Sequence, residues 1–217
     1  MKRSLVLFGL GALFAATASA GAQARTTGSG IPVSKDGPAV STTGSVTTVS
    51  PGEVSLTTSF NLAAYANMNE KNIAAHMAAG DSLEIRLAEL ALSKASSQAV
   101  RDYASMLLTA HRAHLADVME IITDEDVGAE PMANDPEGMR MRQMLTRLQG
   151  MPAGASWDAA FVRFQVQHHQ NEIDLLTLNI KNVHDDDFEE LVEESLKSLA
   201  SHRDQGRQVA SSLGIGL

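Results

Sequence analysis

The sequence contains no cysteine, which excludes disulfide bonds, thiolate metal ligands and a lipid-modified N-terminal cysteine. A transition metal would therefore depend on histidine and carboxylate ligands. Aromatic residues make up only 4% of the 217 residues, whereas alanine, leucine and methionine are plentiful. Because strands draw on aromatic and β-branched residues, this composition favours packed helices over a sheet.

Clusters of basic residues are also lacking. The formal net charge is −9, from 17 Lys and Arg against 26 Asp and Glu. An acidic chain without a basic patch binds nucleic acid poorly, so we expect no nucleic-acid partner. Beyond the N-terminus there is no apolar run of membrane-spanning length, so we expect no transmembrane segment in the mature chain.

The first 24 residues have the pattern of an export signal. Lys2 and Arg3 precede an apolar run, Leu5–Ala16, which is too short to span a membrane comfortably. Small residues suited to cleavage follow, and we expect cleavage after Ala24, with Ala20 as the alternative. The predicted location is the periplasm or the outside of the cell.

Residues 25–66 are predicted to form a tether, because Ser, Thr, Gly and Pro are abundant in 25–58 and no helical period appears there. Within this tether, residues 59–66 are predicted to form a short helix across the main body. The remainder, 67–217, is predicted to be a single helical domain.

Four long segments of this domain place apolar residues at intervals of three and four. The predicted helices are residues 67–95, 97–122, 156–183 and 186–213. Their expected capping residues are Asn67, Ser97, Ser156 and Asp186. A long connection between helices 2 and 3 contains a short helix at 138–149. We predict an all-α, ferritin-like four-helix bundle with a crossover between helices 2 and 3; an up-down bundle is the alternative.

Each long helix carries an ionisable residue on its apolar stripe, near its middle. These residues are Glu84, His111, His169 and His202. Each lies roughly 13–17 residues from its helix start, so at about 1.5 Å per residue all four reach a similar height. One carboxylate and three imidazoles suit a borderline divalent ion such as Zn, Fe, Mn or Cu. The spacing therefore predicts a site for one metal ion.

Three neighbouring residues are predicted to support these ligands or to replace one of them: Asp81, His114 and Glu172. Glu172 follows His169 by three residues, so it is expected to ligate the ion or to orient that imidazole. His168 faces about 100° away from His169 and is expected at the solvent or at a helix interface.

The histidines lack the Glu-x-x-His motif that classical di-iron bundles carry on two helices. No acidic residue precedes any histidine by three positions. This absence argues against a two-iron oxidase and favours a single ion or a metal-free polar network. His76 is expected at the core or its rim, and His184 in solvent.

Four stretches resemble a widespread group of exported bacterial proteins, catalogued as a domain of unknown function and placed among ferritin-like bundles. They are NIAAHMAAGDSLEIRLAELALSKASSQAVRDYA, MLLTAHRAH, FVRFQVQHHQNEIDLL and LASHRDQGRQVA, within roughly residues 70–213. The family pattern falls on Glu84-Ile85, His111, His169-Gln170 and His202. The resemblance implies the fold and a periplasmic or outer-membrane address, but no activity.

The chain departs from this pattern at Ala110, where the family usually has Asp before the histidine of helix 2. That Asp would orient or charge-balance the imidazole of His111, so its absence bears on metal affinity. His114 stands where the family usually has another residue, and it is a candidate substitute.

The sequence leaves three functions open. The first is a periplasmic bundle that holds one divalent ion for storage, sensing or stress defence. The second is a metal-dependent oxidoreductase in which water or oxygen reaches an open position on that ion. The third is a non-catalytic envelope or interaction protein whose His/Glu cluster is structural, with an envelope component or a second copy as partner.

Overall fold

The computed structural model describes residues 60–124 and 127–217. The predicted export signal and most of the predicted tether lie outside the described residues. The described part is helical throughout, with five α-helices in chain order: α1 (Glu70–Lys94), α2 (Gln98–Asp124), α3 (Pro136–Gly150), α4 (Ala155–Asn179) and α5 (Asp186–Ser212). The short 3₁₀ segment η1 (Leu62–Tyr65) precedes α1, and η2 (Ile180–Asn182) leads from α4 toward α5.

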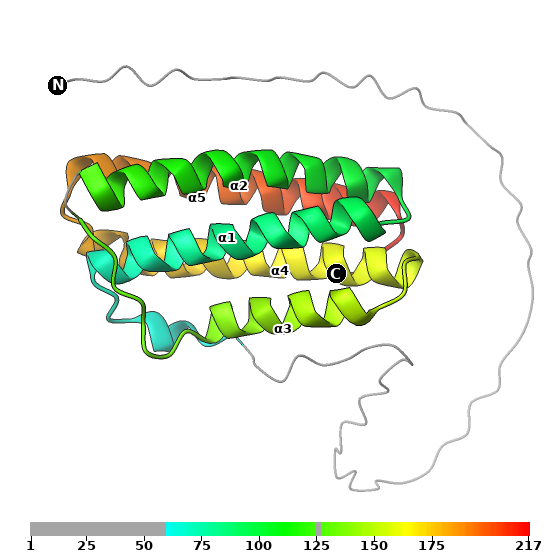
Figure 1. Ribbon diagram of the computed structural model, residues 1–217, viewed down its shortest axis with the longest axis horizontal. Helices are drawn as coiled ribbons and strands as arrows, with labels where there is room; N and C mark the ends of the chain where they lie inside the picture. Colours follow the sequence, from blue (N-terminus) through cyan, green and yellow to red (C-terminus); the bar gives the residue numbers. More distant parts are fainter. Residues whose placement is uncertain (1–59, 125–126) are drawn as a thin grey trace, which may run out of the picture. The chain divides into compact units, whose positions relative to one another are not determined.

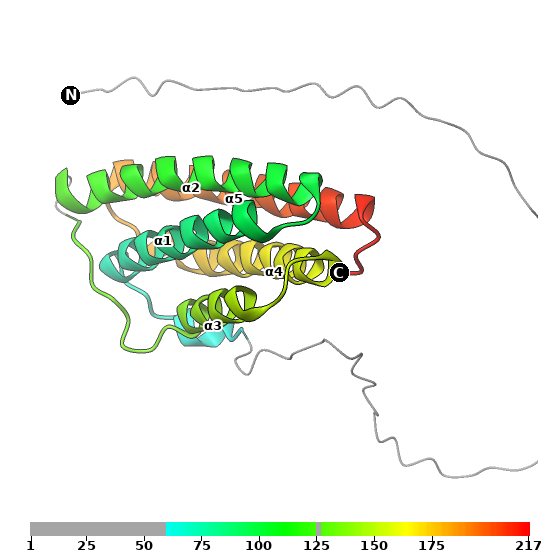
Figure 2. The same cartoon turned by 45° about the vertical axis from the view of Figure 1, so that its right-hand side comes forward.

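Helices α1, α2, α4 and α5 form a four-helix bundle. Helix α1 packs against α2 and α4, and α5 packs against α2 and α4. Figure 1 shows α2 and α4 running in one direction and α1 and α5 in the other, so neighbouring helices are antiparallel. Helix α3 carries the chain back along the bundle and lies beside α1 and α4 in both views (Figure 1, Figure 2). This arrangement confirms the predicted all-α bundle with a crossover between its second and third long helices.

The apolar core has two parts. One contains Trp157 and Phe161, near the start of α4, and the other contains Ile73 and Phe188, near the starts of α1 and α5. Along each long helix, a stretch of buried polar and charged side chains separates the two parts. The candidate site lies in this polar layer, where each buried group needs a partner.

The predicted helices lie close to the observed ones, but three of the predicted caps are wrong. Asn69, rather than Asn67, caps α1. Asp185, rather than Asp186, caps α5, and Ser156 lies inside the first turn of α4, which has no side-chain cap. A cap must stand immediately before the first helical residue for its oxygen to reach the free N–H groups, so a shift of one or two residues changes the capping residue.

The turn between α1 and α2 is held by a side chain of α4. The carboxylate of Asp158 accepts hydrogen bonds from the backbone N–H groups of Ser96, at 3.0 Å, and Ser97, at 2.8 Å. N–H groups at the start of a helix such as α2 have no acceptor within the helix, and Asp158 supplies one for these two. The interaction fixes the position of the α1–α2 pair along the bundle axis relative to α4. It therefore also fixes how the site residues of these helices are aligned with one another.

A glycine brings α5 close to α2. A Cβ added to Gly206 would lie 2.8 Å from the hydroxyl of Tyr103 and 2.9 Å from Cγ2 of Val166. One turn earlier on α5, the Tyr103 hydroxyl donates a hydrogen bond of 3.0 Å to the carbonyl of His202. The close approach therefore sets the position of His202 in the bundle.

Candidate metal centre

Three histidines from three helices meet in the polar layer. The ring nitrogens that His111, His169 and His202 offer as ligands lie within 4.8 Å of one another, and all three side chains are buried. Glu84 of α1 joins them, with its Oε2 3.9 Å from Nε2 of His111. The structure thus brings together the four residues selected from helical spacing, one from each long helix.

Four buried atoms of this cluster make no hydrogen bond. They are Nε2 of His111, Nε2 of His169, Nδ1 of His202 and Oε1 of Glu84. Oε1 of Glu84 lies 3.4 Å from Nε2 of His168, and Oε2 accepts a hydrogen bond of 2.9 Å from Gln165, so the three ring nitrogens are the clearer case of missing partners. A buried polar atom without a partner costs roughly 1–3 kcal/mol. Several such atoms in one cluster are a strong indication of a missing partner, and a cation would satisfy lone pairs of both nitrogen and oxygen.

Hydrogen bonds at the far side of two rings determine which nitrogen is free. His111 donates from Nδ1 to Oδ1 of Asp81 at 2.8 Å, and His169 donates from Nδ1 to the carbonyl of Gln165 at 2.7 Å. With the proton on Nδ1, the neutral ring presents a lone pair at Nε2. Metal-ligating histidines are usually supported in this way by a carboxylate or a carbonyl.

Burial keeps two of the rings neutral. It lowers the pKa of His169 well below the usual range, and the nearby His202 lowers it further. Burial also lowers the pKa of His202 to about 3, with His111 as a second cause. At neutral pH both imidazoles are therefore unprotonated, and protons compete little with a metal ion for their nitrogens.

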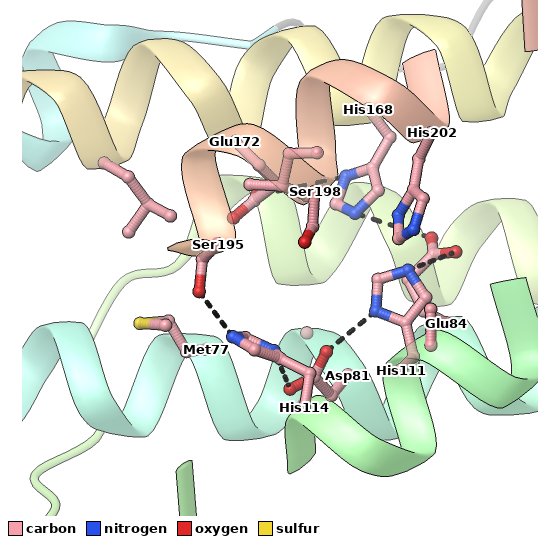
Figure 3. Close-up of a pocket in the computed structure, with 14 residues that line it drawn as sticks. Met77, Asp81, Glu84, His111, His114, His168, Glu172, Ser195, Ser198 and His202 are labelled. Atoms are coloured by element: carbon pink, nitrogen blue, oxygen red, sulfur yellow. Dashed lines mark hydrogen bonds and ion pairs between the residues drawn. The ribbon is translucent and has the colours of Figure 1, made fainter. Parts of the chain in front are cut away.

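Asp81 connects this cluster to a second histidine of α2. Its Oδ2 lies 2.8 Å from Nδ1 of His114, whose Nε2 lies 2.5 Å from the hydroxyl of Ser195 (Figure 3). Burial raises the pKa of Asp81, but hydrogen bonds from both histidines bring it below the usual value. Asp81 therefore gives His111 an anionic partner that Ala110 cannot provide.

Glu172 does not orient His169 as expected. Its Oε2 lies 3.0 Å from Nε2 of His76, and its Oε1 lies 3.9 Å from Nδ1 of His168. Burial lowers the pKa of His76, but the charge of Glu172 outweighs this effect and raises it to about 9. His76 is therefore a charged partner of Glu172 in the interior.

A second group of buried ionisable residues, which the sequence did not predict, contains Glu137, His168 and Glu172. Glu137 lies at the start of α3, and its Oε1 is 2.7 Å from Nδ1 of His168. Arg140 donates to both carboxylate oxygens, at 2.9 and 2.6 Å, and Asn171 donates at 3.2 Å. Burial raises the pKa of Glu137, but the hydrogen bonds from His168 and Arg140 outweigh burial and lower it to about 2. Burial lowers the pKa of His168, but the hydrogen bond to Glu137 and the charges of nearby carboxylates outweigh burial and raise it.

The contributions of Glu137 and Arg140 were missed, and the short helix predicted at 138–149 left Glu137 in the connection before it. Asp135 followed by Pro136 is a helix-start pattern, and Asp135 does cap α3 by accepting from the N–H of Gly138. A helix starting there places Glu137 and Arg140 three apart on one face. No local spacing indicates that this face reaches His168, which is buried and not at the solvent.

The two groups differ in charge and in whether all of their buried polar atoms have partners. The Glu137 group is an ion-paired network in which arginine and histidine balance the carboxylates, and Glu137, His168 and Glu172 have no unpartnered buried atom in the described part of the chain. The His111 group has two neutral rings and free lone pairs. Glu84 lies between the groups, with Oε1 3.4 Å from Nε2 of His168. The His111 group is therefore the better candidate for a metal site.

Comparisons with known proteins agree with this fold. No curated protein matches the sequence. The crystal structure of a DUF305 fragment from Deinococcus radiodurans matches with a TM-score of 0.55 and 19% identity, over 67% of this chain and 95% of that one, which shows the fold alone. Within the described residues, no helix is both long enough and apolar enough to cross a membrane. The model of the family described as Domain of unknown function (DUF4142) matches residues 56–209, and the chain therefore belongs to that family.

Proposed function

We propose that this protein binds one divalent metal ion through Glu84, His111, His169 and His202. The observation that carries the proposal is the cluster of three buried histidines, each with a ring nitrogen that makes no hydrogen bond, beside the carboxylate of Glu84. The hydrogen bond between Asp81 and His111 supports it, because it leaves the Nε2 lone pair of that ring free.

Three nitrogens and one carboxylate oxygen suit Zn, Fe, Mn or Cu. The role that we infer is storage, sensing or stress defence in the periplasm or outside the cell, and the export-signal pattern of the first 24 residues supports that location. The net charge of −9 favours the approach of cations.

A structural polar network is the competing function for the same residues. The Glu137 group supports it, since that group shows that this bundle can bury a fully paired network of charged residues. A structural network and a metal site differ in one measurable respect, which is whether the free nitrogens take up an ion.

A cobalt titration of the metal-free protein tests the proposal. We expect about one Co²⁺ per chain and a visible absorption band, with affinity falling on the order of 100-fold or more in His169→Gln, because a ligand is lost. The matched control is His184→Gln, which changes an exposed histidine outside both groups. No cobalt binding by the parent, or equal binding by His169→Gln, would refute the proposal.

A further inference from the structure

A pocket beside the candidate metal centre reaches the protein surface. Its volume is about 80 Å³, which is room for a few water molecules. The exposed Ser198 of α5 and the half-buried Gly80 and Ala110 belong to its lining. Figure 3 shows the Ser198 hydroxyl directed into the space between His114 and His202.

Three of the four proposed ligands line this pocket, and the fourth does not. Glu84, His111 and His202 belong to its walls, whereas His169 has no exposed surface and is not part of the lining. The unpartnered atoms of Glu84 and His111 thus belong to side chains of the wall. An ion held by all four residues would have one side toward the pocket.

The lining combines an apolar part with a hydrogen-bonding part. Met77, Leu176 and Leu199 supply apolar surface. His114 and Ser195 also line the pocket and are hydrogen-bonded to each other. A ligand there would meet both packing contacts and polar groups that can donate or accept.

The charges around the pocket select against anions. Asp81, Glu84 and Glu172 line it, and among the described residues its lining contains no lysine or arginine. His168 also lines the pocket; burial lowers its pKa and Glu137 raises it above the usual value, but the ring is paired with Glu137 and Glu84. The carboxylates of Asp81, Glu84 and Glu172 therefore oppose the approach of an anion.

Building on the proposed function, we propose that this pocket binds a small uncharged molecule next to the metal ion. The volume of about 80 Å³ suits a ligand of a few heavy atoms, such as dioxygen, nitric oxide or hydrogen peroxide. The ligand would lie in the pocket lined by Glu84, His111 and His202, with His114 and Ser195 at the polar wall. The protein is then a metal centre open to a diffusible molecule rather than a closed store.

Nitric oxide and Fe²⁺ serve as probes in the test. The full chain is loaded with Fe²⁺ without oxygen, its iron content is measured, and nitric oxide binding is followed by electron paramagnetic resonance. Gly80→Leu fills the pocket, since a Cβ at Gly80 meets no atom within 4 Å and the side chain has space to enter. Ala110→Leu fills it from α2, and Ala79→Leu is the control at an exposed position next to Gly80.

We expect the parent and Ala79→Leu to bind nitric oxide, and both filled variants to keep their iron but bind nitric oxide at least about tenfold more weakly. An iron-loaded parent without a nitric oxide signal, or filled variants that bind as tightly as the parent, would overturn the inference and leave the metal site standing. Azide binding as tight as that of nitric oxide would overturn the preference for uncharged ligands. A parent that binds no iron would refute the proposed function itself.

Discussion

The pKa values of the buried histidines differ because their neighbours differ, and not because their burial differs. His169 and His202 lie against each other and against His111, and burial keeps their pKa values low. His76 and His168 are equally buried, yet facing carboxylates raise their pKa values. Six of the seven histidines lie on helices, but the pairing that separates the two classes comes from side chains on other helices.

Asp81 should matter for metal affinity although it is not a proposed ligand. We predict that Asp81→Asn weakens metal binding about 10–100-fold, because the amide supports the imidazole of His111 less well than the carboxylate does. Competition with a chelator measures the change. Asp117→Asn, at an exposed position of α2, is the control. Equal affinities of Asp81→Asn and the parent would contradict this role.

The His76–Glu172 pair should make stability depend on pH in a defined window. The pKa of His76 is raised from 6.5 in the unfolded chain to about 9 in the fold, so protonated His76 stabilises the fold most below pH 6.5. This contribution, roughly 3 kcal/mol, is lost as the pH rises from about 6.5 to 9.

Urea unfolding at pH 6.5 and pH 9 measures this contribution. We expect the free energy of unfolding to fall less over this range in His76→Gln than in the parent or in His184→Gln. The same fall in all three proteins would show that the pair does not carry the effect.

At the scale of helices, the sequence was enough to predict the bundle and four of its central residues. The apolar stripes fix which face of each helix is buried, and equal distances from the helix starts place Glu84, His111, His169 and His202 at one height. The contribution of α3 could not be predicted, because a loop-like sequence supplies Glu137 through tertiary packing and not through periodicity. The caps were misplaced because several polar residues compete at each helix start.

Two glycines in long helices should respond oppositely to alanine. We predict that Gly206→Ala destabilises the fold by about 1–3 kcal/mol, because the new Cβ would lie 2.8 Å from the Tyr103 hydroxyl and force α5 away from α2. Gly80→Ala should stabilise it by roughly 0.5–1 kcal/mol, since its Cβ meets nothing and alanine favours the helix. Thermal unfolding of the metal-free parent and of both variants measures these changes. A Gly206→Ala variant that is as stable as the parent would contradict the close contact.

At the scale of the whole molecule, the described chain buries a polar layer between two apolar regions. On one side of this layer, Arg140 and His168 pair with Glu137. On the other side, three histidines each keep a ring nitrogen without a hydrogen bond. Apolar residues of similar volume at the three histidine positions would remove these unpaired nitrogens. The imidazoles with free lone pairs therefore support the proposed metal site.

Elemental analysis of the untagged protein, purified from cells that express the full sequence, tests this account most directly. The comparison is a Glu84→Ala/His169→Ala double variant purified in the same way. We predict about one divalent ion per chain in the parent and almost none in the variant, because two ligands are lost. Absence of metal from both proteins, with a variant that is less stable but equally helical, would contradict the account and identify the four residues as a buried hydrogen-bond network.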